Sequence, residues 1–367
     1  MTQPLSSGVF RERRPSRALR LGGVSVGNGA PVSVQSMAKT DTRDVAATVA
    51  QIRQLELCGC DIIRVAVPDE AAARALKPIR EAIRIPLVAD IHFDHRLAIL
   101  AIEAGVDGLR INPGNIGSAC NVREVVRAAA PRRVPIRIGV NSGSLEKSLL
   151  ARHGGATAEA LVESALAHAR ILEDAGHREI KISVKASDVK RTVLAYRLLA
   201  ERTDYPLHLG LTEAGTRVAG TVRSSVAIGM LLAEGIGDTI RVSLTDEPAQ
   251  EVKVGIELLR CLGLRPPGAS VVSCPTCGRV EIDLIRLARE AETALEQWYR
   301  ERLDAPRPLV AVMGCMVNGP GEARDADIAI AGGKGRAAIY VAGKHVATVS
   351  EADAVQALLE RVRAWKP

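Results

Sequence analysis

Aromatic side chains are scarce in this sequence, at 2% of 367 residues. Proteins that hold single-stranded nucleic acid stack its bases on aromatic rings, so we expect no nucleic-acid partner. No apolar run approaches the roughly 20 residues that a membrane-spanning helix needs, so we expect no membrane span. The stretch Phe10–Arg20 lacks the apolar segment of an export signal. We therefore expect residues 1–20 to form a surface arm of a cytoplasmic protein.

The cysteines number seven, an odd count in a chain without an export signal. This indicates reduced thiols that are available to bind metal rather than to form disulfide bridges. The net charge is +7, which suits an anionic ligand or partner but is equally explained by solubility. The length exceeds that of one ordinary domain and predicts two.

Short apolar runs rich in β-branched residues recur along the first part of the chain, each followed by a helical pattern. Several of the helical patterns end in Gly, as helix C-caps do. Eight strands alternating with helices over about 250 residues predict an α/β fold, a (β/α)8 TIM barrel, with an open doubly wound sheet as the alternative. The runs are Val32–Met37, Ile62–Val67, Pro86–Ile91, Gly108–Ile111, Pro135–Val140, Glu179–Lys185, Leu207–Leu211 and Thr239–Leu244.

Polar residues fall at or beyond the later half of most of these strands. Buried strands tolerate charge poorly without a partner, and the carboxyl ends of barrel strands converge on the mouth where active sites lie. The repetition favours a ligand site at the mouth over isolated salt bridges. The positions are Arg64, Asp90, His92, Arg110, Asn112, Arg137, Asn141, Lys181, Ser183, Lys185, His208, Glu213, Arg241 and Ser243.

Among these residues, four cations from four different strands are the candidate anion ligands. Cations that converge on one small mouth predict a bound polyanion, because guanidinium and ammonium groups match phosphate oxygens. The loops Asn112–Asn115 and Asn141–Ser144 contain Gly and can bring backbone N–H groups close to phosphate. Glu213 is the leading carboxylate for proton transfer or for contact with a hydroxyl. The cations are Arg64, Arg110, Arg137 and Lys185.

The regular alternation of strands and helices ends after Gly263. The segment Arg265–Gly268 contains two prolines and is typical of a linker, so we place a barrel domain at 1–264 and a second domain at 265–367. The second domain is predicted to be α+β. It would hold a short strand at 269–273, a long helix at 281–303, strands at 308–313, 326–331 and 337–341, and a closing helix at 351–365.

The second domain carries the residues with metal-binding spacing. Cys274 and Cys277 can grip one metal ion or cluster, and Cys315 follows a strand in a loop rich in Gly and Pro. Thiolates select zinc or iron–sulfur clusters, which usually take four ligands. Since His345 lies in a late strand pattern, a carboxylate is considered as the fourth ligand, and Glu322 shares the Cys315 loop. Unrelated buried cysteines are the alternative.

At these residues the sequence closely resembles the 4-hydroxy-3-methylbut-2-enyl diphosphate synthase family, in its shorter, two-domain bacterial form. The resemblance covers nearly the whole chain, with matching segments in the same order. One departure is Ala38-Lys39, where the family pattern has Thr-Asn. The segments are Asp44–Thr48, Arg64–Pro68, Ala89–Phe93, Arg110–Asn115, Gly139–Ser144, Thr212–Gly215, Ser273–Cys277 and Gly314–Glu322.

The resemblance implies an oxidoreductase of the methylerythritol phosphate route to isoprenoids. Its reaction would be the reductive ring opening of 2-C-methyl-D-erythritol 2,4-cyclodiphosphate with loss of one hydroxyl as water, using a 4Fe–4S cluster and electrons from ferredoxin or flavodoxin. Glu213 would lie beside the carbon skeleton. Cys274, Cys277, Cys315 and Glu322 would hold the cluster, and Arg64, Arg110, Asn112, Arg137, Asn141 and Lys185 would hold the diphosphate, with Asp90 and His92 at the same mouth.

A head-to-tail homodimer is the expected assembly. The last barrel helix (about residues 250–262) would end opposite the mouth, and a four-residue linker spans at most about 14 Å, whereas that helix is about 20 Å long. A C-terminal domain tethered there would serve the mouth of a two-fold partner more easily than its own. A monomer whose small domain folds back is the alternative, and the family resemblance favours the dimer.

Two other functions fit parts of the pattern. A phosphate-handling barrel lyase or aldolase with a structural zinc domain would be colourless, whereas an iron–sulfur protein is brown. A nucleic-acid-binding protein would show steep salt dependence of binding.

Overall fold

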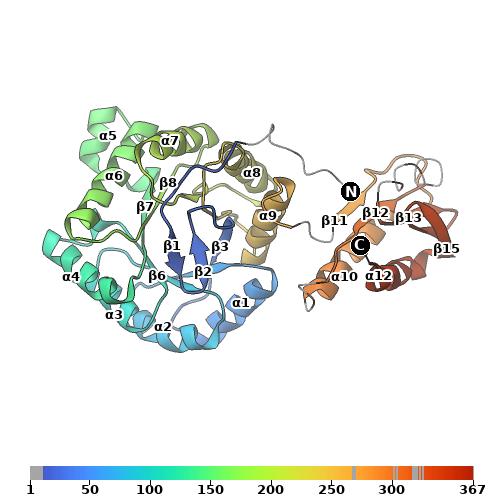
Figure 1. The fold of residues 1–367 in the computed structure, drawn as a ribbon, viewed down its shortest axis with the longest axis horizontal. Helices are drawn as coiled ribbons and strands as arrows, with labels where there is room; N and C mark the ends of the chain where they lie inside the picture. The colour runs from blue at the N-terminus through green and yellow to red at the C-terminus, as the bar shows by residue number, and fades with distance from the viewer. Residues whose placement is uncertain are drawn as a thin grey trace. The chain divides into compact units, whose positions relative to one another are not determined.

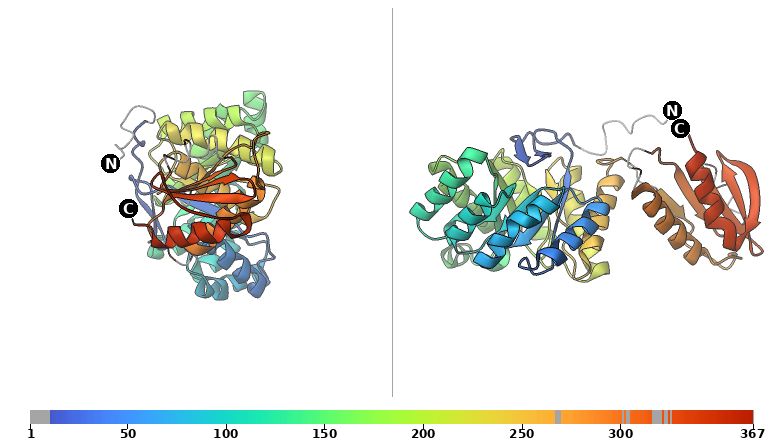
Figure 2. Two further views of the ribbon diagram at one scale, coloured as in Figure 1. Left: turned by 90° about the vertical axis from the view of Figure 1, so that its right-hand side faces the viewer. Right: turned by 90° about the horizontal axis from the view of Figure 1, so that it is seen from below.

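The computed structural model describes residues 11–266, 270–300, 302, 305–315, 321, 324 and 326–366. The chain divides into two compact units, Met1–Arg265 and Pro266–Pro367 (Figures 1 and 2). No helix in the described ranges combines the length and the apolar character that crossing a membrane requires.

The first unit is a closed barrel of eight parallel strands in the order β8-β7-β6-β5-β4-β3-β10-β9 (Figure 1). A parallel bridge between Ile182 and Leu207 joins the two ends of the sheet. The predicted barrel is therefore confirmed over the open sheet. The strands are β3 Ser33–Met37, β4 Ile62–Ala66, β5 Leu87–Asp90, β6 Gly108–Ile111, β7 Ile136–Asn141, β8 Ile180–Lys185, β9 His208–Leu209 and β10 Thr239–Ile240.

Helices surround the barrel. Asp44, Asp69 and Asp94 cap three of them, each accepting a hydrogen bond from a backbone N–H of the first turn. The helices are α1 Val45–Leu57, α2 Glu70–Ala82, α3 His95–Glu103, α4 Ala119–Ala129, α5 Lys147–His153, α6 Ala158–Asp174, α7 Val189–Arg202, α8 Arg217–Ala233 and α9 Pro248–Cys261, with short 3-10 turns at Pro113–Asn115, Ala130–Arg132 and Ser142–Ser144.

Successive side chains along each barrel strand lie in two different environments. Their apolar residues, such as Ile63 and Val65 of β4, belong to the core formed with the helices. The alternate residues face the barrel interior, because successive strand side chains point to opposite faces. In most TIM barrels that interior is packed with branched apolar side chains. Here it is polar, and its buried members include Gln35, Asp90, Arg110, Arg137, Lys181, Ser183, Lys185, His208 and Thr239.

A small hairpin of β1 (Leu19–Leu21) and β2 (Val24–Val26) packs at the amino-terminal end of the barrel. Its apolar side chains form a separate cluster with Ile62 and Val88, which lie early in β4 and β5. This cluster supplies apolar packing below the charged interior.

The second unit has a five-stranded sheet in the order β11-β12-β13-β14-β15, parallel from β11 to β13 and antiparallel beyond. Its apolar face packs against two helices, as predicted for an α+β domain. The fifth strand, β15, was indicated only by the strand pattern around His345 and was given no bounds, because most of its residues are exposed. The elements are β11 Ser270–Ser273, α10 Leu284–Arg300, β12 Leu309–Met313, β13 Ile328–Gly333, β14 Arg336–Val341, β15 Lys344–Ser350, the 3-10 turn Glu351–Asp353 and α12 Ala354–Ala364.

Candidate active site

A row of charged residues crosses four neighbouring barrel strands. The strand register pairs Asp90 with Arg110, Arg110 with Arg137, and Arg137 with Lys181. All four residues are buried. Arg64 on β4 joins them, with its Nε 3.5 Å from Asp90 Oδ2. In this row one carboxylate therefore faces four cations.

The Arg110 guanidinium is fixed on several sides. Its Nη1 donates to Asp90 Oδ1 at 3.1 Å and lies 2.7 Å from His92 Nε2, and its Nη2 donates to the Gly139 carbonyl at 2.9 Å. A Cβ at Gly139 would lie 2.5 Å from Arg110 Nε, so a larger residue there would displace the guanidinium. The Gly139 N–H in turn donates to Asn112 Oδ1 at 3.1 Å. Asp90 and His92 thus position the Arg110 guanidinium directly, and Asn112 positions Gly139, whose carbonyl accepts from it.

Several buried guanidinium nitrogens have no acceptor in the described part of the chain. Arg137 Nη1 donates to Ser183 Oγ at 2.6 Å, but its Nε and Nη2 are without a hydrogen-bond acceptor. The same holds for Nε of Arg64, Arg110 and Arg241. A buried N–H without an acceptor costs about 1–3 kcal/mol, more when it is charged. An oxygen-rich anion would satisfy these donors.

Burial and mutual repulsion shift the charges of this interior. Burial, with Arg137 next in effect, lowers the pKa of Lys181 to about 7, and burial and the same neighbour hold the pKa of Lys185 well below its usual range. Burial alone would raise the pKa of Asp90, but Arg64, Arg110 and Arg137 outweigh it and lower that pKa. The interior therefore carries an excess of positive charge, which favours an anion.

The remaining predicted mouth residues come close to this group in different ways. A Cβ at Gly210 would lie 2.8 Å from Lys185 Nζ, which places that ammonium against the turn after β9. Asn141 is the register partner of Lys185. Glu213 is exposed in the same turn with a φ of 54°, a left-handed conformation that is uncommon for Glu. No hydrogen bond or ion pair within the described residues joins Glu213 to the cation row.

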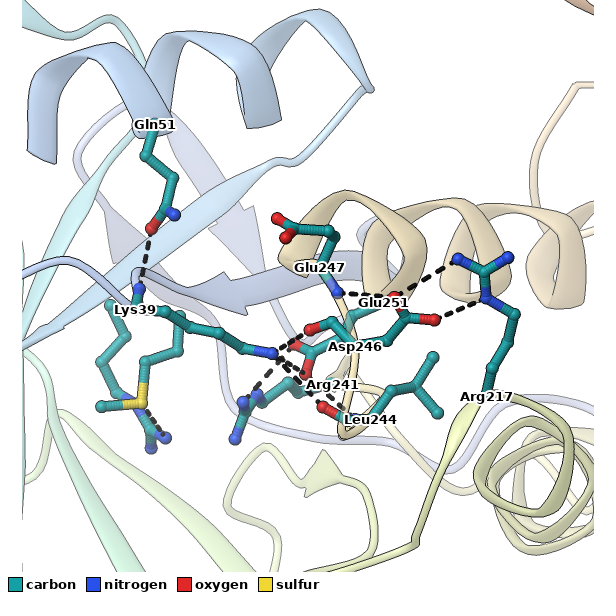
Figure 3. A network of polar contacts seen from close by, with 10 residues as sticks. Lys39, Gln51, Arg217, Arg241, Leu244, Asp246, Glu247 and Glu251 are labelled. Carbon is teal, nitrogen blue, oxygen red and sulfur yellow. Dashed lines mark hydrogen bonds and ion pairs between the residues drawn. The ribbon is translucent and has the colours of Figure 1, made fainter. Parts of the chain in front are cut away.

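The sequence missed Glu251 and did not place Arg241 among the ligands. Glu251 lies in the first turn of α9 and is buried. Its Oε1 accepts from the Leu244 N–H at 3.0 Å, and its Oε2 lies 3.4 Å from Arg241 Nη2 (Figure 3). Glu251 therefore forms an ion pair with Arg241. The only signal in the sequence was an acidic residue on the apolar side of a helix.

Lys39 fastens the mouth loops together (Figure 3). Its backbone N–H donates to Gln51 Oε1 at 2.7 Å, and its Nζ donates to the carbonyls of Leu244, at 3.3 Å, and Asp246. The same Nζ lies 3.8 Å from a Glu251 carboxylate oxygen. The residue that departs from the expected Thr-Asn pattern thus links the loop after β3 to the loop after β10.

The second unit places Cys274 and Cys315 at one edge of its sheet, and Cys277 lies in the loop that follows β11. Cys274 follows β11 and Cys315 follows β12, two parallel strands whose carboxyl ends lie together, and the Cys274 N–H donates to the Val312 carbonyl at 3.2 Å. A hydrogen bond with Cys277 is the main cause that raises the pKa of Arg279, and the charges of Cys315 and Cys274 add to it. The Arg279 guanidinium therefore interacts with all three cysteines.

These thiols fit an iron–sulfur cluster by their chemistry, since thiolates are its usual ligands. Within the described residues no group of three or more His, Cys, Asp or Glu is arranged to hold a metal ion. Glu322, the predicted fourth ligand, lies outside the described residues, as does the segment 316–320.

The fold and site define a (β/α)8 barrel protein with a cationic interior and a thiol-bearing C-terminal unit. The family model of the GcpE TIM-barrel domain matches residues 16–256, and that of the GcpE protein C-terminal domain matches residues 270–364. The chain therefore belongs to the GcpE family.

Two relatives are similar over nearly their whole length, and both are named 4-hydroxy-3-methylbut-2-en-1-yl diphosphate synthase (flavodoxin). The protein of Geobacter sulfurreducens is 58% identical over 95% of this chain and 97% of its own. That of Thermodesulfovibrio yellowstonii is 55% identical over 96% of this chain and 99% of its own. Among solved structures, dihydropteroate synthase from Stenotrophomonas maltophilia matches 69% of this chain and all of its own, with 14% identity and a TM-score of 0.49.

Anion binding is expected to weaken as the pH rises from 7 to 9. Lys181 has a pKa of about 7, and a bound anion raises it, so binding above pH 7 takes up a proton. If binding takes up one proton, the affinity for the anion falls by at most about tenfold for each unit by which the pH rises. Sulfate is the probe, because it stays a dianion throughout, and calorimetry in buffers of different ionisation enthalpy measures the proton uptake. Lys181→Met should flatten the profile, whereas a flat profile for the unmodified protein would contradict the assignment.

Proposed function

We propose that the chain catalyses the reductive ring opening of 2-C-methyl-D-erythritol 2,4-cyclodiphosphate to 4-hydroxy-3-methylbut-2-enyl diphosphate in isoprenoid biosynthesis. The reaction takes in two electrons, breaks a carbon–oxygen bond to the diphosphate and releases one hydroxyl as water. The observation that carries this proposal is the set of buried guanidinium groups with unused N–H donors, Arg64, Arg110 and Arg137. The shared name of the near-full-length relatives supports the same reaction.

The barrel residues would bind and orient the substrate. Arg64, Arg110, Arg137 and Lys185 would hold the diphosphate as it becomes the leaving group, with Asn112 and Asn141 adding amide contacts. Asp90 and His92 keep the Arg110 guanidinium in position. Glu213 lies in an exposed turn after β9, where it would contact the carbon skeleton and move a proton.

A 4Fe–4S cluster is the proposed cofactor, held by Cys274, Cys277, Cys315 and Glu322. When bound, it would supply the electrons that side chains cannot. The interaction of Arg279 with all three cysteines supports the site. A carboxylate is a harder ligand than a thiolate, so Glu322 would mark the iron most open to ligand exchange. The relatives' name favours flavodoxin as the electron donor, with ferredoxin as the alternative.

The proposed working unit is a cytoplasmic head-to-tail homodimer in which each cluster serves the partner's barrel. The way the chain leaves the barrel supports it. Arg265 is the last residue of the barrel unit, and its guanidinium contacts the Gly59 carbonyl at 3.3 Å and Asp61 at 2.5 Å. Both partners directly precede β4, so the chain leaves the barrel at the end opposite the mouth.

The cluster assignment is tested by replacing single cysteines. Cys315→Ser is expected to lose most of the iron and the brown colour after anaerobic purification, because one thiolate ligand is gone. Cys120→Ser, at an exposed position of α4, is the matched control and should keep both. Glu322→Ala should impair activity more than cluster assembly, since three thiolates remain. Full activity of Cys315→Ser would refute the assignment.

Two substitutions test substrate binding and the chemical step separately. Arg137→Ala is expected to raise KM roughly tenfold to more than a hundredfold with the iron content unchanged, since a buried charge-assisted hydrogen bond contributes about 1.5–3 kcal/mol. Glu213→Gln should instead lower kcat with a milder effect on KM, which is the signature of a lost transition-state contact. Unchanged kcat in Glu213→Gln would exclude that residue from the chemistry.

The trans arrangement predicts complementation between two inactive variants. Glu213→Ala and Cys315→Ala, mixed under conditions that exchange subunits, should regain activity because the mixed dimer holds one intact barrel facing one intact cluster. Subunit exchange is followed by mass labelling of one variant. Demonstrated exchange with activity at background would mean that the cluster does not work in trans.

A further inference from the structure

His168 of α6 lies where an outer helix meets the loops after two neighbouring barrel strands. Helix α6 is on the outside of the barrel (Figure 1), packs on β7 and β8 and contacts the 3-10 turn Pro113–Asn115 that follows β6. The His168 side chain is buried, with 4% of the residue exposed. Its ring can therefore act on loops that leave the carboxyl ends of β6 and β7.

The first contact of His168 is with Gly114, in the loop after β6. A Cβ at Gly114 would lie 2.5 Å from His168 Nε2, so the imidazole fills the space that a side chain would need. The φ of Gly114 is not positive, and the close approach of the ring therefore explains the glycine better than its backbone conformation does. The same loop begins with Asn112, whose Oδ1 accepts from the Gly139 N–H at 3.1 Å. Because that oxygen is engaged, the Asn112 amide nitrogen is the atom that can donate to an anion.

The second contact of His168 is with Glu146, in the loop after β7. His168 Nε2 lies 2.9 Å from Glu146 Oε1. Ser164 Oγ, one turn earlier on α6, donates to the same carboxylate at 2.9 and 3.0 Å. Glu146 follows the 3-10 turn Ser142–Ser144 and directly precedes α5. Two side chains of α6 therefore hold the end of the loop that contains Asn141.

Filling space does not require an imidazole at this position. The Nδ1 atom of His168 is buried without a hydrogen-bond partner among the residues that the structure describes, and such an atom destabilises a fold. An apolar side chain of similar volume would pack here without that cost. Burial lowers the pKa of His168 although Glu146 opposes the shift, so the ring is neutral at pH 7 and donates through Nε2. The N–H that points to Glu146 is thus what distinguishes His168 from an apolar residue.

Both loops lead to cations of the barrel interior. The Gly139 carbonyl, whose own N–H is bound by Asn112, accepts from Arg110 Nη2 at 2.9 Å. Asn141 is the register partner of Lys185. A shift of either loop would therefore move an asparagine relative to the cation beside it.

We propose that His168 is a positioning residue of the anion site. Through Gly114 and Glu146 it fixes the loops after β6 and β7, so that Asn112 and Asn141 face the diphosphate. The inference rests on the proposed function for the identity of the anion, and His168 acts through the two loops rather than by contact with the substrate.

Replacement of His168 tests this role. His168→Leu is expected to raise KM for the cyclodiphosphate and Kd for inorganic pyrophosphate, measured by calorimetry on the holoenzyme, by about tenfold each, because Glu146 loses a donor. The effect on kcat should be much smaller than that on KM. His168→Gln keeps an N–H near the position of Nε2 and should restore both values. Glu146→Ala should raise KM to the same extent, and the double variant no further, because both substitutions remove one hydrogen bond.

His177→Leu is the matched control. His177 is also buried, but it lies just before β8 at the amino-terminal end of the barrel, with its Nε2 3.1 Å from the Glu179 carbonyl oxygen. Its replacement should lower Tm about as much as His168→Leu and leave KM and Kd unchanged. An equal rise of KM in His177→Leu would mean that loss of stability alone explains the effect, and would refute the positioning role.

The two ligands separate this inference from the proposed function. An unmodified holoenzyme that binds pyrophosphate but does not turn over the cyclodiphosphate would refute the proposed function, and the pyrophosphate Kd of His168→Leu would then decide the positioning role. Turnover by the unmodified enzyme, with KM and Kd unchanged in both His168→Leu and Glu146→Ala, would refute the positioning role alone. If His168→Leu does not fold, Glu146→Ala, at a half-buried side chain, decides the question by the same two measurements.

Discussion

Burial of several cations side by side inside the barrel is the constraint on which the rest of this structure depends. Water is excluded from Arg110, Arg137, Lys181 and Lys185, and each destabilises the charge of its neighbours. Asp90 and a few carbonyl and hydroxyl oxygens offset part of this cost. The apolar layer between strands and helices, together with the hairpin cluster at the amino-terminal end, supplies the stability that the interior lacks. The unused donors are the groups that the proposed polyanion would satisfy.

The mouth is held by contacts between loops that are distant in the sequence. Lys39 links the loops after β3 and β10. Arg217, at the start of α8, contacts Asp246 in the loop after β10. Buried Glu251 holds the base of the same loop through the Leu244 N–H.

Both units place their candidate functional side chains on or directly after neighbouring parallel strands. In each, parallel strands deliver reactive side chains at their carboxyl ends: Arg110 and Arg137 in the barrel, Cys274 and Cys315 in the second unit. Parallel neighbours end at the same edge, so residues far apart in the sequence meet without long loops. The proposed electron supply and the proposed anion binding would thereby be built on separate sheets.

The sequence by itself determined the strand–helix alternation, the polar positions late in each strand and the paired cysteines, because these depend on local periodicity and spacing. Only the tertiary structure decided which of these residues meet. Closure of the barrel and strand register set Asp90, Arg110, Arg137 and Lys181 in one row. The contact of Lys39 with the loop before α9 joins segments about two hundred residues apart, and no local pattern encodes such a contact. The bounds of strand β15 escaped prediction for the same reason, since an exposed strand is specified by its partner across the sheet rather than by its own alternation.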